Sequence, residues 1–465
     1  MKSFSKLALS LLLLLSLTFT ACKREIIDDA TNEFQKVAAY DNEIIHEWNE
    51  LFTVLDRYAA GFRPVGITMV SGYTNLAVYE ATVTGMPEYK SIASEFQGLT
   101  IPKAFTNQEY HWPTVINAVN NYMYSRFFPK VDQKYFSRVK ALNDKYEKKY
   151  LDEVSQEVFV RSKNHGIAVA AAVWEWYSTD PIGFELYNDP FKGNTWQERV
   201  NEPGAWVPTY PGPGDGLYAL GGKCRTFAIK DDLLLCKPYT DYVGRFTEEP
   251  GKGIYNQALE VMNYQTSELS YTSKWIGEFW SDDLLDVTFS PPPRWFAIAD
   301  QVFKLEKSNL ETAVITNAKL GLALNDAAVG AWNSKFHYNL MRPETYIQQY
   351  IDPSFEPILN NPVTNETGIT PPFPAHPSGH STFAGAGAEI LSGIFGYSYG
   401  MTDRCHENRG DFLGTPRTFN SFRQMAEEIA ISRVMLGVHF RVDNEEALKY
   451  GKNIADAVNK LPWKK

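Results

Sequence analysis

The chain has 465 residues, with 45 lysine and arginine residues against 55 aspartate and glutamate residues, so its formal charge is −10 at neutral pH. This acidic balance excludes a general nucleic-acid-binding protein, which would need a basic face. Hydrophobic residues make up 44% of the chain and aromatic residues 14%. That supply of apolar side chains is enough for a large core and excludes a mostly disordered chain.

The N-terminus has the three-part order of a secretory signal peptide. A basic start precedes an apolar run from Leu7 to Phe19, and the small pair Thr20-Ala21 follows. The run is shorter than the ~20 apolar residues that a membrane span needs. Because Cys22 comes next, followed by polar residues, the segment resembles the lipobox of bacterial lipoproteins, although Phe19 stands where that pattern prefers leucine.

The lipobox resemblance predicts a signal peptide over residues 1–21, a lipid on Cys22 and a polar tether over residues 22–33. The protein would then be an exported bacterial lipoprotein, held on the periplasmic or cell-surface side of a membrane without spanning it. The alternative is a signal peptide that is cleaved elsewhere, with Cys22 incidental.

Helical periodicity covers most of the remaining chain, since apolar residues recur at spacings of three and four. We therefore expect an N-terminal helical region over residues 34–200 and a C-terminal helical, catalytic region over residues 251–465. Residues 201–250 between them begin with a Pro/Gly-rich stretch that cannot form a regular helix and is expected to be an ordered loop. Strand patterns are scarce. The predicted fold class is all-α, with residues 34–465 as one compact unit.

Individual helices are expected over residues 33–84, 112–128, 132–177, 255–272, 298–342, 378–395, 421–436 and 445–459. A break is predicted at Phe289–Trp295, where three prolines follow one another.

Three cysteines remain after Cys22, too few for a disulfide framework or a cysteine-based zinc site. Export makes a bridge between Cys224 and Cys236 possible, and the sequence leaves the paired and the free state open. Cys405, which lies beside His406, has no third ligand candidate close by and is interpreted as structural or without a role.

The first segment that carries chemistry holds Lys335 and Arg342, with Pro343 directly after. Seven residues of helix turn through about 700°, close to two full turns, so we expect both cations to point the same way. Pro343 would end the helix and place Arg342 at its end. Taken alone, such a pair is more typical of a solvated basic stripe.

The second segment is Pro377-Ser378-Gly379-His380, at the start of a helix of small residues. Ser378 can cap the helix, and Gly379 lets the backbone approach a ligand closely. Unpaired N–H groups at a helix N-terminus bind anions. His380 could exchange a proton with such an anion near neutral pH. The alternative is a capped helix with a chance histidine.

The third segment contains Arg433, His439 and Asp443. Arg433 offers a planar fork for two oxygens of a phosphate-like ion. His439 follows the expected helix end at Gly437 and could attack or coordinate the central atom of that ion. Asp443 could hold the other ring nitrogen of His439, or cap the last helix, and the two roles are compatible.

In this order, the patterns K-x6-R-P, P-S-G-H and S-R-x5-H resemble the signature of the vanadium-dependent haloperoxidases and the type 2 phosphatidic acid phosphatase superfamily. Asn325-Asp326 and Trp206-Val-Pro-Thr209 extend the likeness upstream toward bacterial members. The resemblance implies two packed helical bundles joined by Pro/Gly-rich loops. It also implies an anion site for vanadate, which phosphate can occupy as well, formed by Lys335, Arg342, Ser378, Gly379, Arg433 and His439.

In the haloperoxidase branch, the resemblance implies that His439 binds vanadium, that His380 is the acid/base group and that Asp443 supports His439. The substrates would be hydrogen peroxide and a halide. In the phosphatase branch, His439 would attack a phosphate ester and form a phosphohistidine, while His380 would protonate the leaving alcohol. Both branches use small-molecule substrates, and the sequence carries no signal for the oligomeric state.

The residues beyond the anion favour the haloperoxidase branch. Trp332 and Phe373 match positions where chloroperoxidases carry aromatic residues near the halide, although both are also consistent with ordinary core residues. His376 stands where that pattern has tyrosine, which leaves the halide preference open. His337 is expected to be a surface or packing residue. The superfamily's lipid phosphatases often span membranes several times and its soluble acid phosphatases are usually much shorter, so we keep a phosphatase as the alternative.

Two other classes of function are less consistent with the pattern. A protein that only captures phosphate would need the cations but not the paired histidines His380 and His439. A metal hydrolase would need carboxylate or histidine ligands, whereas these segments are dominated by cations that repel a divalent ion.

Overall fold

Helices carry nearly all the regular structure in the part of the chain that the structure, a computed structural model, describes: residues 34–209, 214–237, 253–266, 270–282, 284–411 and 413–465. A two-stranded antiparallel hairpin, β1 (Met401–Asp403) and β2 (Arg417–Phe419), pairs Met401 with Phe419. The prediction of an all-α fold is confirmed. None of the described helices combines the length and the apolar character needed to cross a membrane.

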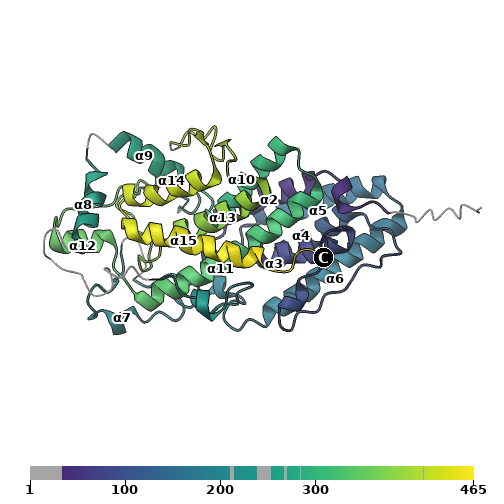
Figure 1. Ribbon diagram of the computed structural model, residues 1–465, viewed down its shortest axis with the longest axis horizontal. Coiled ribbons are helices and arrows are strands. Elements are labelled where there is room, and N and C mark those ends of the chain that lie inside the picture. Colours follow the sequence, from purple (N-terminus) through teal and green to yellow (C-terminus); the bar gives the residue numbers. More distant parts are fainter. Residues whose placement is uncertain (1–33, 210–213, 238–252, 267–269, 283, 412) are drawn as a thin grey trace, which may run out of the picture. The chain divides into compact units, whose positions relative to one another are not determined.

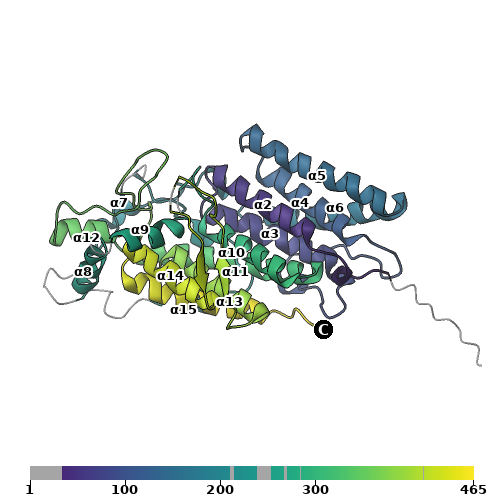
Figure 2. The same cartoon turned by 90° about the horizontal axis from the view of Figure 1, so that it is seen from above.

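The N-terminal group of helices consists of α2 (Glu43–Tyr58), α3 (Val65–Thr82), α4 (Trp112–Phe127), α5 (Gln133–Glu153) and α6 (Gln156–Ser178). Within it, α4 packs against α3, α5 and α6, and α2 packs against α5. Figures 1 and 2 show these helices side by side. They form the first of two packed groups.

The C-terminal group is built around α13 (Gly379–Phe395), which packs against α11 (Leu310–Tyr338), α14 (Phe422–Met435) and α15 (Arg441–Asn459) (Figure 1). Three shorter helices, α8 (Tyr255–Asn263), α9 (Ser270–Phe279) and α12 (Pro343–Tyr350), lie at its edges. The contact between α13 and α15 is close because a Cβ at Gly451 would collide with the backbone carbonyl of Thr382. Glycine at this position therefore lets the two helices that carry Ser378 and Asp443 approach one another.

Two helices connect these groups. Helix α10 (Pro291–Glu306) contacts α2 and α13, and α11 packs along α3 as well as α13. Residues 36–465 accordingly form one compact unit. The predicted signal peptide, Cys22 and most of the predicted tether lie outside the described residues.

The prediction of one continuous helix over residues 298–342 is wrong, because the start, the end and the continuity of the helix all differ in the structure. The three prolines predicted to break the chain are the first turn of α10, where missing N–H groups cost nothing. Helix α10 then ends with Lys307 as its C-cap residue. Helix α11 begins after its N-cap residue Asn309, whose side chain accepts the N–H of Thr312 at 3.0 Å. Local capping therefore divides a stretch whose apolar periodicity is continuous.

The expected loop at residues 201–209 packs against the end of α11. The backbone N–H of buried Trp206 donates to the carbonyl of Asn339 at 2.8 Å, and Thr209 donates to the carbonyl of Thr370 at 3.3 Å. A short helix, α7 (Trp196–Arg199), precedes this loop. Residues 210–213 and 238–250 of the predicted loop region lie outside the described residues.

The three described cysteines are free thiols, so the possible bridge between Cys224 and Cys236 is not formed. The two sulfurs lie in different surroundings: that of Cys224 is 3.9 Å from the Leu220 carbonyl, and that of Cys236 is 3.6 Å from the Lys237 carbonyl. Burial raises the pKa of Cys236 to about 12, which keeps its thiol protonated and unreactive.

Candidate active site

Lys335 lies in the last turn of α11 and is completely buried. Its ammonium group donates to the carbonyls of Pro374 at 2.8 Å and Ala375 at 2.9 Å. These two bonds fix the nitrogen beside the segment that leads into Ser378. An ammonium group has three donors, so one donor remains for an anion.

Arg342 is not on the same helix as Lys335, which corrects the predicted geometry. Helix α11 ends at Tyr338, Asn339 adopts a left-handed conformation with φ 52°, and Arg342 is the residue before α12. The physical reason is that Asn tolerates the left-handed region and Pro343 favours the first position of a new helix. The two cations meet because the chain turns, and not because of helical spacing.

Backbone carbonyls hold the guanidinium of Arg342 in place. It donates to Phe373 at 2.9 Å, to Pro371 at 3.1 Å and to Val438 at 2.8 Å, and its Nη1 lies 3.0 Å from Nε2 of His439. Arg342 thereby joins the first predicted segment to the second and the third.

The second segment begins α13 as predicted. Ser378 is the N-cap residue, and its hydroxyl accepts the N–H of Ser381 at 3.4 Å. Gly379 and His380 are the first two residues of the helix, and a Cβ at Gly379 would lie 3.4 Å from the ring of Trp332. His380 is 8% exposed, compared with 2% for His439. His380 is therefore the better placed of the two to exchange a proton with solvent.

The third segment folds back on itself after α14. Arg433, fully buried, lies in the last turn of the helix, and its carbonyl accepts the N–H groups of Val438 at 3.1 Å and His439 at 3.3 Å. Gly437 makes this reversal with φ 84°, a region that favours glycine. The turn returns His439 to the buried end of the helix that carries Arg433.

Asp443 supports His439 but does not cap the last helix as the N-cap residue. Helix α15 starts at Arg441, four residues earlier than expected, with Phe440 as the N-cap residue and Asp443 in its first turn. One carboxylate oxygen, Oδ2, accepts the N–H of Phe440 at 3.1 Å and lies 3.3 Å from Nδ1 of His439. The Asp443 carboxylate therefore accepts the backbone N–H of the N-cap residue from within the first turn of α15, as the acidic residue of a capping box does.

These contacts define the tautomer of His439. Its Nδ1 faces a carboxylate, so it carries the proton, and its Nε2 accepts from Arg342. Burial, followed by the charge of Arg342, holds the pKa of His439 well below its usual range. The imidazole is thus neutral at pH 7, with a lone pair on Nε2 beside the cations.

The charges at the site are unbalanced in favour of the cations. Burial and the neighbouring Arg342 hold the pKa of Lys335 well below its usual value. Burial raises the pKa of Asp443, but the contacts with His376 and His439 outweigh it and the net shift is downward, so the carboxylate stays ionised. A site that disfavours the charge of its own lysine is suited to binding an anion.

The sequence singled out His376 only as a departure from the tyrosine of the chloroperoxidase pattern, and its contact with Asp443 was missed. His376 is 1% exposed, and its Nδ1 lies 3.4 Å from the second carboxylate oxygen of Asp443. Its place two residues before Ser378 was the available signal, but only the packing of α13 against α15 shows the contact. His337, by contrast, is exposed and contacts the ring of Tyr338.

Trp332 and Phe373 form an aromatic wall beside the cations. Their ring centroids are 5.0 Å apart, Lys335 Nζ lies 4.9 Å from the Phe373 centroid, and the Arg342 guanidinium lies 5.0 Å from it. The indole N–H of Trp332 donates to the Leu217 carbonyl at 3.0 Å. The two rings therefore present apolar, aromatic surface to the cations.

Asp326, upstream on α11, has a structural role. Its carboxylate accepts the backbone N–H groups of Phe227 and Ala228 at 2.7 Å and of Ile229 at 3.0 Å. Burial raises the pKa of Asp326 to about 6 in spite of these bonds. The residue anchors the segment at 225–229 to the helix that carries Lys335.

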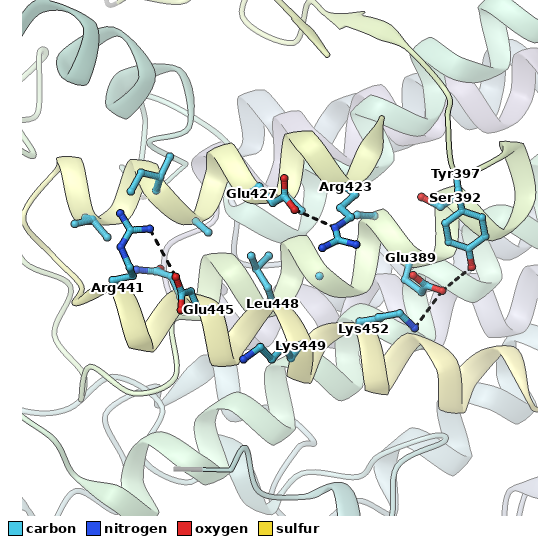
Figure 3. A pocket seen from close by; sticks show the side chains of 17 residues that line it. Glu389, Ser392, Tyr397, Arg423, Glu427, Arg441, Glu445, Leu448, Lys449 and Lys452 are labelled. Atoms are coloured by element: carbon cyan, nitrogen blue, oxygen red, sulfur yellow. Dashed lines mark hydrogen bonds and ion pairs between the residues drawn. The ribbon is translucent and has the colours of Figure 1, made fainter. Parts of the chain in front are cut away.

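A separate pocket of about 470 Å³ lies between α13, α14 and α15 (Figure 3). Its rim carries ion pairs, such as Arg423 with Glu427 at 2.9 Å and Lys452 with Glu389 at 3.5 Å, and none of the candidate site residues lines it. Within the described parts of the chain, no three His, Cys, Asp or Glu side chains gather in an arrangement that could hold a metal ion. The cationic cluster around Lys335 and His439 is therefore the site whose chemistry the three segments define.

The described residues thus combine a helical fold with a buried cationic cluster and an oriented histidine. Residues 316–462 match the family of the second helical-bundle domain of vanadium chloroperoxidase. The chain is 26% identical over 220 residues to vanadium chloroperoxidase from Curvularia inaequalis and 29% identical over 150 residues to vanadium-dependent bromoperoxidase from Ascophyllum nodosum. The matched segments span 36% and 29% of this chain, and 35% and 27% of the length of the two relatives.

Solved structures extend the likeness over nearly the whole chain. A bacterial vanadium-dependent iodoperoxidase covers 91% of this chain and 97% of its own, with a TM-score of 0.77 and 26% identity. A bacterial vanadium-dependent chloroperoxidase covers 87% and 93%, with a TM-score of 0.66 and 14% identity, which shows the shared fold alone. Residues 316–462 therefore match the second helical-bundle domain of vanadium chloroperoxidase, and the fold as a whole is similar to that of bacterial vanadium-dependent peroxidases, as the sequence motifs indicated.

Proposed function

We propose that the protein is a vanadate-dependent haloperoxidase that uses hydrogen peroxide to oxidise a halide. The observation that carries the proposal is the orientation of His439, whose Nδ1 is held by Asp443 and whose Nε2 lies beside Arg342. The likeness to the iodoperoxidase structure makes iodide the first halide to test.

The residues present fit vanadate. The Arg342 guanidinium contacts His439, and the Lys335 ammonium lies against the same Phe373 ring as Arg342, so two cations are grouped as a tetrahedral oxyanion requires. His439 offers a neutral nitrogen that can serve as the protein ligand of vanadate. When bound, vanadate supplies the metal centre that activates hydrogen peroxide toward the halide. The groups that would hold its oxygens are Lys335, Arg342, Ser378, the N–H of Gly379, and Arg433.

The protein's own groups would then perform three tasks. The cations stabilise charge on the oxygens as it redistributes, which is electrostatic catalysis by preorganised donors. His380 takes or gives the proton at the start of α13. Trp332 and Phe373 exclude water from the side where a weakly hydrated halide would enter.

The experiment tests purified protein in phosphate-free buffer for vanadate- and peroxide-dependent oxidation of iodide, bromide and chloride. We expect halide oxidation that requires vanadate and falls at least about 10³-fold in His439→Ala, because the metal's protein ligand is lost. Hydrolysis of an aryl phosphate that vanadate inhibits, with no halide oxidation, would reject the proposal in favour of a phosphatase with a phosphohistidine.

The cellular location is part of the same proposal. Cys22 is the lipid-bearing residue of an exported bacterial lipoprotein, because it follows an apolar run and the small pair Thr20-Ala21. Mass spectrometry of the N-terminal peptide from membranes should find a diacylglyceryl group on Cys22. In Cys22→Ala, an unlipidated protein with an unchanged cleavage site would argue against the lipobox.

A further inference from the structure

Asp443 is shared by two histidines, one on each carboxylate oxygen. His439 Nδ1 lies 3.3 Å from Oδ2, and His376 Nδ1 lies 3.4 Å from Oδ1. The side chains of all three residues are at most 3% exposed. The carboxylate is thus enclosed between two imidazoles from segments far apart in the chain.

The segment around His376 is tied to Asp443 a second time. The N–H of Ser378 donates to the backbone carbonyl of Asp443 at 3.0 Å. Tyr338 packs edge-on against the His376 ring, with centroids 5.6 Å apart, and its hydroxyl donates to the Cys236 carbonyl at 2.8 Å. His376 therefore has a defined position on the far oxygen of the carboxylate.

We infer that His376 is a positioning residue for His439, acting through Asp443. A carboxylate held on one oxygen can rotate about its Cβ–Cγ bond, whereas the buried imidazole of His376, 3.4 Å from the other oxygen, restricts that rotation. With that rotation restricted, Oδ2 holds the Nδ1–H of His439 and keeps Nε2 directed toward the anion. The inference rests on the proposed function, since its consequence is the affinity of the site for vanadate.

Vanadate and phosphate should differ in their contact with His439. Vanadate would be bonded to His439 as well as held by the cations and by the donors at Ser378 and Gly379, whereas phosphate would be held by those groups without a bond to His439. Loss of the His376 contact should therefore weaken vanadate binding far more than phosphate binding. A defect in folding or in the cationic cluster would weaken both anions alike.

The test compares His376→Phe with His376→Tyr, which differ by one hydroxyl group that can donate to Asp443. Titration calorimetry with vanadate and with inorganic phosphate, together with ⁵¹V NMR of bound vanadate, reads out the site without turnover. We expect His376→Phe to raise the vanadate Kd by about 10- to 100-fold and to shift the ⁵¹V resonance. His376→Tyr should recover most of the affinity, and the exposed control His337→Phe should match the wild type.

A double-mutant cycle shows whether His376 acts through Asp443. In an Asp443→Asn background, which weakens the hydrogen bond of Nδ1, His376→Phe should add little to the loss of vanadate affinity. Full additivity, equal losses for both anions, or wild-type affinity in His376→Phe would each overturn the inference. If His376→Phe does not fold, His376→Leu, which also lacks a donor, and His376→Tyr carry the same comparison.

The inference and the proposed function fail in different ways. Wild-type protein that binds vanadate, with no selective loss in His376→Phe, rejects the inference alone. Wild-type protein that binds phosphate but not vanadate rejects both.

Discussion

Arg294 and Lys335 are both fully buried cations, yet their surroundings act on them in opposite ways. Arg294 lies 2.9 Å from Asp403 and 3.2 Å from Asp282, and it donates to Nε2 of His406 at 2.7 Å. Burial alone would lower the pKa of Arg294, but these carboxylates outweigh it and the net shift is upward. The pKa of Lys335 is lowered, because burial and Arg342 outweigh Asp443.

The difference separates a structural cluster from the proposed anion-binding site. The cluster around Arg294 contains its own counter-charges and joins α10 to the hairpin that includes Asp403, so it needs no ligand. The site around Lys335 has cations whose charge the protein compensates incompletely, and an anion would complete it. Burial of a charged group therefore does not by itself distinguish a structural cluster from a binding site. The balance between the buried charges and their counter-charges does.

The largest expected effect is on the free energy of unfolding, at the Arg294 cluster, whose buried charges balance one another. Arg294→Met leaves Asp403 and Asp282 buried without their cation, so the free energy of unfolding should fall by about 3–5 kcal/mol. Urea denaturation measures it. Phosphate affinity of the folded protein should stay unchanged, and a stability loss below about 1 kcal/mol would contradict the view of Arg294 as a structural centre.

The opposite pattern is expected at the cationic site. Lys335→Met should lower the affinity for phosphate and vanadate about 10²- to 10³-fold, because one preorganised donor and its charge are lost. The free energy of unfolding should change by less than about 1 kcal/mol. Because the pKa of Lys335 is lower in the folded than in the unfolded protein, the charged lysine destabilises the folded state at pH values below its unfolded pKa. Removal of this destabilisation in Lys335→Met should offset the loss of the two hydrogen bonds of the ammonium group. Calorimetry and urea denaturation on one preparation check both parts.

The pH dependence of binding sharpens the same contrast. A bound anion favours the charged form of Lys335, so binding takes up a proton once the pH exceeds the lowered pKa of this residue. Affinity for phosphate should therefore fall as the pH rises through that pKa, while Arg342 and Asp443 keep their charges. Because phosphate itself titrates, the measurement is the difference between wild type and Lys335→Met. Parallel curves for the two proteins would reject the assignment to Lys335.

The smallest effect is expected at the surface, where water screens charge. Arg423 pairs with Glu427 on the rim of the pocket between α13, α14 and α15, and its side chain is 83% exposed. Arg423→Ala should change the free energy of unfolding by no more than about 0.5 kcal/mol. A thermal-unfolding midpoint well below that of the wild type would show that this surface pair is coupled to the helices beneath it.

The sequence was sufficient for the fold class and for the residue types of the site. Apolar spacing predicts helices, and α13 and α14 begin within one residue of their expected starts because Ser378 and Ser421 are strong capping residues. The pairing of Asp443 with His439 also followed from spacing, since both lie within four residues. Features that depend on a single turn or cap can be predicted in this way.

Predictions that relied on one helix continuing were wrong where the chain has a local alternative. Apolar periodicity runs through Lys307 and past Asn339, but each adopts a left-handed conformation and ends a helix. The sequence correctly predicted that Lys335 and Arg342 lie close together, but the predicted reason, a shared helix face, was wrong. Their meeting depends on carbonyls of residues 371–375 and 438 that hold both side chains.

By itself, the sequence determined which groups this protein has for handling an oxyanion: cations, a capped helix start, and histidines beside an aspartate. Tertiary structure alone decided how those groups are charged and aimed. The contact of His376 with Asp443, and the lowered pKa values of Lys335 and His439, arise from segments that are distant in the chain and are buried together. Burial and charge at that range depend on packing, which no local pattern encodes.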